Sequence, residues 1–281
     1  MRIVNKRHLV KRIVRIAIVV FLLLFVFAYI FPIIWMVIGS FKTDADVNAM
    51  PPKIIFEPTI TNYKEVLIDN QLIFFLRNSV IIVLFSSILA VAVGTLAAYA
   101  LSRFSFKGNR DLAFFILSTR IAPPVMVVIP IFIMFNTFQL YNTFVGMILV
   151  YTAMNLPLSV WLLRSFFLDI PRELDEAAEI DGCGKMTAFF RVILPLTMPG
   201  LAATLILSMI FAWNEFLFAL ILTARNTRTL PVTVTTFISG MGIQWGQLNA
   251  AGTMIMFPLL IFAFVMQKRL LTGLTMGAVK G

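Results

Sequence analysis

The 281-residue sequence contains only one cysteine, Cys183, and one histidine, His8. A single cysteine cannot form an internal disulfide or a cysteine-rich metal site. Because His8 lies in a basic N-terminal tail, the apolar part of the chain lacks the histidine that a catalytic triad or a metal cluster would use. The sequence also shows no paired acids and no nucleophile beside a base. We therefore expect a protein that is not an enzyme and holds no metal.

Signatures of nucleotide and nucleic-acid binding are missing as well. The run Gly182-Cys183-Gly184-Lys185 does not satisfy the G-x-x-x-x-G-K-[ST] pattern of a phosphate loop, and no strand is expected before it. The formal net charge is +10, yet the basic residues fall mainly at the ends of apolar runs and form no stripe interleaved with aromatics. We expect no cofactor in this chain and no nucleic-acid partner. If ATP drives its function, a separate subunit binds the ATP.

Apolar residues dominate what is present. They make up 60% of the chain, and the mean hydropathy is +0.96. A soluble domain of this size would not carry so much apolar surface, whereas about 20 consecutive apolar residues suffice for one helix to cross a bilayer. The sequence predicts an all-α integral membrane protein with six transmembrane helices, at about residues 13–41, 78–101, 112–135, 143–163, 201–222 and 250–266.

The distribution of basic residues predicts the orientation of these helices. A basic cluster precedes the first span, and Arg103, Lys107 and Arg110 mark the turn after the second. The stretches 42–76 and 223–249 contain few basic residues. Because cytoplasmic loops carry an excess of lysine and arginine, we expect both termini in the cytoplasm and these two stretches outside. One membrane domain is expected over residues 1–281, with a core at about 70–268 and an extra N-terminal helix at about 13–41.

A polar stretch lies between the fourth and fifth spans, at residues 168–200. An acidic first turn predicts a short helix, and Gly182 suits its left-handed stop. Apolar residues at helical spacing predict a second helix from Lys185 to Leu194, which Pro195 and Pro199 would end. The sequence therefore predicts a cytoplasmic helix, a glycine turn and a helix.

Three short motifs in this stretch follow one another at fixed distances: Glu176-Ala177-Ala178, then Gly182, then Leu194-Pro195. Their spacing resembles that of the cytoplasmic coupling loop in permease subunits of bacterial ABC importers. Trp213-Asn214-Glu215-Phe216 and the chain end from Gln267 to Gly281 resemble the maltose-type carbohydrate branch of that family. The resemblance extends over nearly the whole chain.

The resemblance implies a multi-pass permease subunit in the bacterial inner membrane, surrounded by membrane lipid, that translocates a sugar, oligosaccharide or polyol. It implies three kinds of protein partner: a second, homologous permease that completes a heterodimer, a cytoplasmic ABC ATPase dimer that binds the ATP, and an extracytoplasmic solute-binding protein. The 168–200 loop would couple to the ATPase. The resemblance implies that the following residues take part in this coupling: Glu176, Ala177, Ala178, Asp181, Gly182, Leu194 and Pro195.

Two segments can also be interpreted without reference to an ATPase. Without the resemblance, residues 168–200 are an amphipathic interfacial loop with ordinary helix caps. The glycine-rich tail Thr272–Gly281 is either a frayed end or a second docking element for the ATPase.

Glu215 is the most informative position inside a predicted span. A carboxylate at membrane depth costs on the order of 2.5–3.5 kcal/mol, so it needs a partner or a wet cavity. Asn214 and Glu215 either face the translocation cavity and bind substrate hydroxyls, or Glu215 forms a structural pair with a residue such as Arg120. Proton coupling is a third role. Weaker pathway candidates, whose side chains more often bond neighbouring helices, are Asn155, Thr204 and Ser208.

Two other classes of membrane protein compete with the importer subunit. A self-contained secondary transporter or channel would use Glu215 as its proton or ion site. An integral membrane enzyme would need a catalytic constellation, and the sequence shows none. The energy source distinguishes the secondary transporter from the importer subunit. Uptake by a secondary transporter would be sensitive to an uncoupler and would not need an ATPase.

Overall fold

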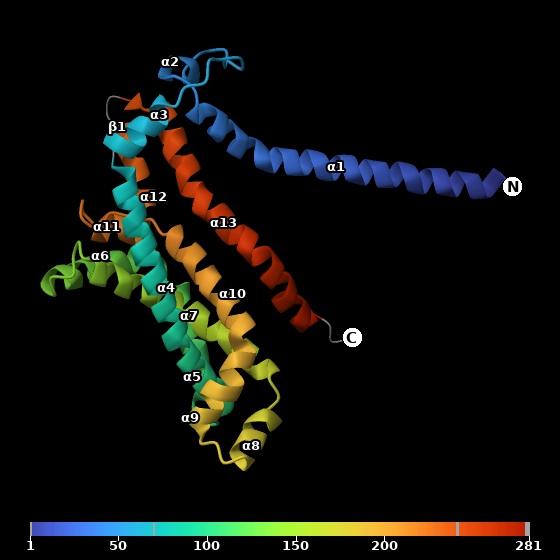
Figure 1. Cartoon of the computed structure of the whole chain (residues 1–281), viewed down its shortest axis with the longest axis vertical. Helices are drawn as coiled ribbons and strands as arrows, with labels where there is room; N and C mark the ends of the chain where they lie inside the picture. The colour runs from blue at the N-terminus through green and yellow to red at the C-terminus, as the bar shows by residue number, and fades with distance from the viewer. Residues whose placement is uncertain (1, 70, 240–241, 279–281) are drawn as a thin grey trace. The chain divides into compact units, whose positions relative to one another are not determined.

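The computed structural model describes residues 2–69, 71–239 and 242–278, and most of these residues are helical (Figure 1). In this part of the chain, five helices are long and apolar enough to cross a membrane, and a bent pair of shorter helices would make a sixth span. The expected helical class and the presence of five to six candidate membrane spans are confirmed. Contacts divide the chain into two compact units, one of residues 1–70 and 237–254 and the other of residues 71–236 and 255–281.

The first unit begins with the long helix α1 (Arg2–Ser40), which has Pro32 in its interior. An 18-residue window within Val10–Ser40 has a mean hydropathy of 3.0 and none of its residues is buried within the chain, whereas Gly39 and Ser40 at the end of the helix are buried. A helix that is apolar all round and unburied in its own chain is suited to lipid or to another membrane protein. The extra N-terminal span is thus one of the five candidate spans.

The rest of the first unit consists of short elements that follow α1, together with the start of the last helix. They are α2 (Asp44–Val47), α3 (Thr61–Lys64), a π-helix (Glu65–Asp69), a hairpin of β1 (Ile238–Ser239) and β2 (Gly242–Ile243), and the start of α13 (Trp245–Ala278). Buried Asn62 donates its amide protons to the carbonyls of Ser40 and Lys42, at 2.9 and 2.8 Å. The bond to Ser40 satisfies a carbonyl that the end of α1 leaves free, and the bond to Lys42 holds the turn that follows the helix.

Three helices form the centre of the second unit: α4 (Leu72–Arg103), α7 (Phe144–Asp169) and α10 (Leu194–Trp213), each packed on the other two (Figure 1). Small residues allow α4 to lie close to α7. A Cβ added at Gly94 would lie only 2.9 Å from the Cβ of Ser159. The small residues of α4 therefore serve close helix packing, as the sequence predicts.

The third span is not the continuous helix expected over 112–135. The structure has α5 (Asn109–Ser118), a 3₁₀ turn (Thr119–Ile121) and α6 (Pro124–Thr137), with a bend of 91° at the break. Pro123-Pro124 causes the break, since proline removes a backbone donor and excludes the helical conformation from the residue before it. This segment is either a broken span or a re-entrant loop.

The fifth span also differs from the prediction, at both ends. It is helical from Lys185, through α9 (Lys185–Ala188), a π-helix (Phe189–Ile193) and α10, so Pro195 and Pro199 do not end a helix. The amide of Leu194 bonds the carbonyl of Phe189, five residues back, and this wider turn accommodates Pro195. At the other end, α10 stops at Trp213, and α11 (Leu217–Leu222) is a separate helix.

Other helix ends differ from the expected ones by several residues. The second span begins at Leu72 and the fourth ends at Asp169, while the last helix begins at Trp245. The stretch expected outside at 223–249 contains α12 (Leu230–Thr233) and a 3₁₀ helix (Val234–Phe237) in addition to the hairpin. The predicted tail is helical through Ala278, and residues 279–281 lie outside the described part.

Candidate functional site

The polar stretch 168–200 contains a short helix that ends in a tight glycine turn. Helix α8 (Glu173–Ile180) is followed by Gly182 at φ +84°. The amide of Gly182 bonds the carbonyl of Glu179 at 3.0 Å, and the amide of Cys183 bonds that of Ala178 at 2.9 Å. This is the Schellman arrangement, in which a left-handed residue after the helix satisfies its last carbonyls. The left-handed stop predicted at Gly182 is present.

The residues expected to couple to an ATPase differ in their exposure. Ala178 is only 6% exposed, which leaves it little free surface for a partner. It lies on the side of α8 that packs on the π-helix. Leu194 is half-buried. The exposed members of the set are Glu176, Ala177, Asp181, Gly182 and Pro195.

Helix α8 is attached to the end of α4 by polar contacts. The Nε atom of Arg103 lies 2.8 Å from Oδ2 of Asp175, and the hydroxyl of Tyr99 donates to Oδ1 of Asp175 at 3.3 Å. The guanidinium of Arg172 donates to the carbonyl of Ser102 at 3.2 Å. Sequence reasoning missed this attachment. Its only local signal is a basic residue at the end of one span and acids in a later loop.

Aromatic packing holds the π-helix against α4 and α7. The ring of Tyr99 lies 5.6 Å from that of Phe167 and 4.5 Å from that of Phe189, measured between centroids. All three side chains are buried in one cluster, which Ile193 joins. The cluster therefore joins the π-helix, which follows α9, to α4 and α7.

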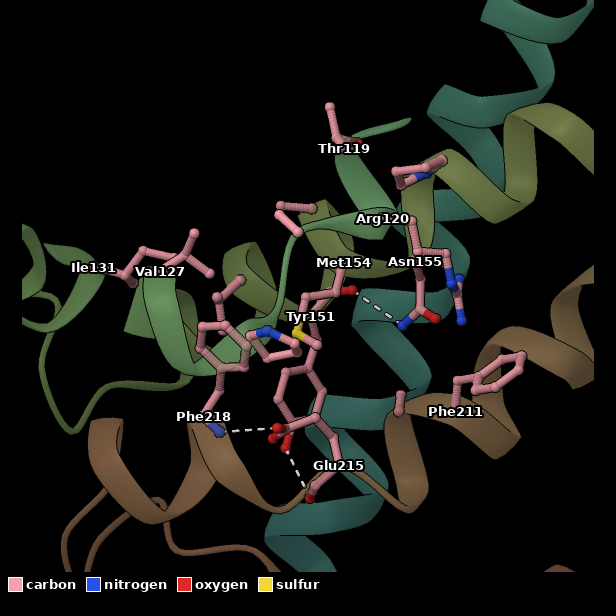
Figure 2. A pocket seen from close by; sticks show the side chains of 16 residues that line it. Thr119, Arg120, Val127, Ile131, Tyr151, Met154, Asn155, Phe211, Glu215 and Phe218 are labelled. Carbon is pink, nitrogen blue, oxygen red and sulfur yellow. Dashed lines mark hydrogen bonds between the residues drawn. The ribbon is translucent and has the colours of Figure 1, made fainter. Parts of the chain in front are cut away.

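A cavity of about 370 Å³ lies beside both helix breaks of the second unit (Figure 2). Arg120 comes from the α5–α6 break and Glu215 from the α10–α11 break, while Tyr151 and Asn155 come from α7. Irregular backbone at membrane depth is tolerated where it is buried in protein or lines a cavity. The third span, which contains three prolines, therefore lines this cavity at its broken point.

The carboxylate of Glu215 is bonded to the backbone at the start of α11. Its Oε1 accepts from the amide of Phe218 at 2.8 Å (Figure 2), and its Oε2 accepts from the amide of Ala219 at 3.1 Å. These bonds satisfy amides that a helix N-terminus leaves free. Sequence reasoning placed Glu215 inside a continuous span and did not foresee this capping, because the end of α10 carries no glycine or proline signal.

Arg120 lines the same cavity, but the ion pairs in the described part of the chain do not include one with Glu215. Its guanidinium lies 4.6 Å from the ring centroid of Phe211, in a cation–π contact. A structural pair between Arg120 and Glu215, one of the roles considered for Glu215, is therefore not formed here. Sequence reasoning considered Arg120 only as that partner and missed it as a cavity residue.

The other pathway candidates divide into two groups. Asn155 lines the cavity and donates its amide to the carbonyl of Tyr151 at 3.0 Å. Thr204 and Ser208 do not line it: Thr204 donates to the carbonyl of Gly200, and the hydroxyl of Ser208 lies 3.3 Å from that of Ser159. Asn214 is exposed, bonds back to Ile210 and is also absent from the lining. The cavity thus brings together Asn155 and Glu215 from the predicted set.

Metal binding finds no support in the described residues. Across residues 2–69, 71–239 and 242–278, the structure has no group of three or more His, Cys, Asp or Glu side chains that could hold a metal ion. The polar groups that line the cavity are amides, hydroxyls, one guanidinium and one carboxylate that is already hydrogen-bonded. Such groups are suited to binding a polar ligand by hydrogen bonds.

Comparison with known proteins gives consistent results. Residues 90–275 match the family described as binding-protein-dependent transport system inner membrane component. The chain is 39% identical to the trehalose/maltose transport system permease protein MalG of Thermococcus litoralis, over 89% of this chain and 91% of that one. It is 36% identical to the trehalose transport system permease protein SugB of Mycobacterium tuberculosis, over 89% and 92%.

A solved structure has the same fold. The crystal structure of a bacterial ABC transporter involved in the import of the acidic polysaccharide alginate contains a chain that superposes with a TM-score of 0.79. The identity is 24%, and the match covers 92% of this chain and 96% of that one.

Proposed function

Because the chain belongs to the family of inner membrane components of binding-protein-dependent transport systems, whose members are transporter subunits and not enzymes, we propose that it translocates a carbohydrate across the bacterial inner membrane. The observation that carries this proposal is the similarity to two sugar permeases, one for trehalose and maltose and one for trehalose, over 89% of the chain in each case. The proposed substrate class is a sugar, an oligosaccharide or a polyol. We propose that residues 1–281 act as one permease domain, with a core at about 70–268.

The proposed assembly contains three further components. A second, homologous permease would complete a heterodimer. An ABC ATPase dimer would bind on the cytoplasmic side, and an extracytoplasmic solute-binding protein would deliver the sugar. Both termini and residues 168–200 would lie in the cytoplasm, in agreement with the positive-inside rule. The match to a family named for its dependence on a binding protein supports the external partner.

The proposed docking surface for the ATPase is the exposed side of α8 with the turn that follows it. Glu176, Ala177 and Asp181 are exposed there. Asp175 and Ala178 face inward, where they hold α8 to α4 and to the π-helix. This division supports a segment that presents one side to a partner and transmits the partner's movement through the other side.

The proposed substrate pathway passes the cavity at the two helix breaks. Asn155 and the guanidinium of Arg120 offer hydrogen-bond donors to sugar hydroxyls, while Glu215 holds the start of α11 in place. Closure of the ATPase dimer would shift α8 and alternate the cavity between inward-open and outward-open states, by rigid movement of packed helices. Thr204 and Ser208 would contribute helix packing in this scheme, and Asn214 would reach substrate only in another conformation.

Purification of the tagged chain from its native membrane in mild detergent tests the proposal. We expect an ABC ATPase and a second permease to be recovered with it, and ATP hydrolysis by the recovered complex. The complex is then reconstituted into vesicles with its binding protein, and uptake of radiolabelled trehalose and maltose is measured. ATP-dependent uptake of either sugar, or of another carbohydrate that the binding protein retains, is the expected result.

The alternative of a secondary transporter makes the opposite prediction for the same vesicles. A chain recovered without an ATPase, which supports uptake without ATP and loses it with an uncoupler, would overturn the proposal. In that case Glu215 would become the candidate proton site.

A further inference from the structure

A cleft lined by three arginines lies where the end of α4, the turn at residues 104–108, the start of α5 and the end of α7 meet. Its volume is about 620 Å³. The arginines are Arg110, Arg164 and Arg172, and the acidic residue in its lining is Asp111. Three positive charges and one negative charge give the lining a net charge of +2. The candidate substrate cavity has a separate lining and shares none of these residues.

The arginines of this cleft have free donor capacity. The Nε atom of Arg164 is buried and has no hydrogen-bond partner in the described part of the chain. Arg172 uses one amino group on the carbonyl of Ser102, and a guanidinium has five N–H donors in all. Arg103 nearby is different, because its charge is compensated by Asp175. A buried donor without a partner costs stability, so a ligand that accepts hydrogen bonds would be favoured here.

An apolar groove of about 200 Å³ adjoins the cleft along α5 and α7. Arg110 and Arg164 line the groove as well as the cleft. The groove also contains Phe114 and Trp161, whose side chains are 70% and 50% exposed. The two arginines thus lie at the boundary between the basic cleft and the apolar groove. Both belong to helices of the predicted third and fourth membrane spans.

We propose that this site binds an anionic phospholipid. The phosphate of the headgroup would accept hydrogen bonds from Arg110 and Arg164, since guanidinium groups bind phosphate in a bidentate manner. An acyl chain would lie along Phe114 and Trp161. The net positive lining disfavours the choline or ethanolamine group of a zwitterionic lipid. Basic pockets between membrane helices on the cytoplasmic side bind such headgroups. This assignment goes beyond carbohydrate transport and holds whatever sugar the protein carries.

Quenching of Trp161 by brominated lipids tests the site in the purified complex. The complex is reconstituted into phosphatidylcholine vesicles that contain either brominated phosphatidylglycerol or brominated phosphatidylcholine. The Trp161→Phe variant gives the fluorescence of all other tryptophans, and its subtraction isolates Trp161. We expect stronger quenching by brominated phosphatidylglycerol, and a loss of about fivefold in the apparent affinity for it in Arg110→Gln or Arg164→Gln.

Lys107→Gln is the matched control, because Lys107 is an exposed basic residue of the same turn that does not line the cleft. It should keep the lipid preference. Equal losses in Lys107→Gln and Arg110→Gln would overturn the site in favour of general surface charge. Removal of the preference by millimolar inorganic phosphate would show that the cleft takes a soluble anion instead.

The Arg110→Gln variant keeps the test valid, and ATPase recovery separates the lipid site from a protein contact. Arg110 is exposed, so Arg110→Gln gives a result even if Arg164→Gln fails to fold. Loss of the ATPase from purified Arg110→Gln, with an unchanged lipid preference, would mean that the arginines contact a protein and would overturn the lipid site. Failure to recover any ATPase with the parent chain would instead count against the proposed importer and leave the lipid measurement valid.

Discussion

The Nε atom of Arg103, the last residue of α4, lies 2.8 Å from Oδ2 of Asp175 in α8, and the two side chains are only 7% and 18% exposed. Removal of one partner of a buried ion pair leaves an uncompensated charge, which costs on the order of 3 kcal/mol. The pair therefore attaches α8 to the end of α4, a helix 32 residues long.

The first prediction concerns this ion pair. Asp175→Asn should weaken the attachment of α8, so transport should fall by at least about tenfold while the chain is still inserted in the membrane. ATP hydrolysis by the complex should continue but respond less to the loaded binding protein. Parallel assays of uptake and hydrolysis check this separation.

Glu173→Gln controls for the loss of a negative charge at the start of α8. Glu173 lies in the same acidic first turn but is exposed, so its replacement changes the interaction with the helix dipole by only a few tenths of a kcal/mol. Equal loss of coupling in Glu173→Gln and Asp175→Asn would contradict the role of the pair with Arg103.

The second prediction separates backbone conformation from space at the glycine turn. Gly182 has φ +84°, while Gly184 has φ −67°, and a Cβ added at either position would meet no atom within 4 Å. Gly182→Val should therefore strain the turn by about 1–2 kcal/mol, because a β-branched residue disfavours positive φ. Gly184→Val should be tolerated.

ATPase recovery in pull-downs and uptake in vesicles measure the difference between the two glycine variants. We expect Gly182→Val to lose both and Gly184→Val to keep both. Similar losses in the two variants would mean that the surface of the turn, and not its left-handed conformation, decides docking.

The third prediction concerns Glu215. Because its carboxylate oxygens accept from the amides of Phe218 and Ala219, Glu215→Ala should destabilise the start of α11 by about 1 kcal/mol. Glu215→Gln keeps one acceptor oxygen and should retain most of the ATP-driven uptake. Thermal unfolding in detergent and uptake at several external pH values measure both effects. Complete loss of uptake in a well-folded Glu215→Gln variant would favour proton coupling instead.

The sequence predicts the helical class and most span positions well, because long apolar runs with basic ends leave few alternatives. Breaks within spans are harder to predict. Pro123-Pro124 interrupts the third span, whereas Pro195 is accommodated by a π-turn, and the local sequence does not distinguish these outcomes. The break after Trp213 has no proline or glycine at all. It depends on the contacts that Glu215 makes with α11.

The candidate site was predictable only in its local parts. The turn at Gly182 follows from the residues around it, since a left-handed helix stop is a property of a few neighbouring positions. The contact between Arg103 and Asp175 joins residues far apart in the chain, and the same is true of the cavity between Arg120 and Glu215. Such contacts depend on how α4, α7 and α10 pack, which one sequence does not specify.

The fourth prediction tests that packing at Gly94. Gly94 lies where α4 meets α7, and an added Cβ would come within 2.9 Å of the Cβ of Ser159 and 3.4 Å of the backbone at Val160. Gly94→Val should force the helices apart and lower stability by about 1–3 kcal/mol. Ala92→Val is the matched control, because Ala92 lies on the same helix but is exposed. We expect a lower midpoint of thermal unfolding only for Gly94→Val. An equal shift in both variants would indicate a general sensitivity of α4 to β-branched residues, and would contradict the close approach of α4 and α7 as the cause.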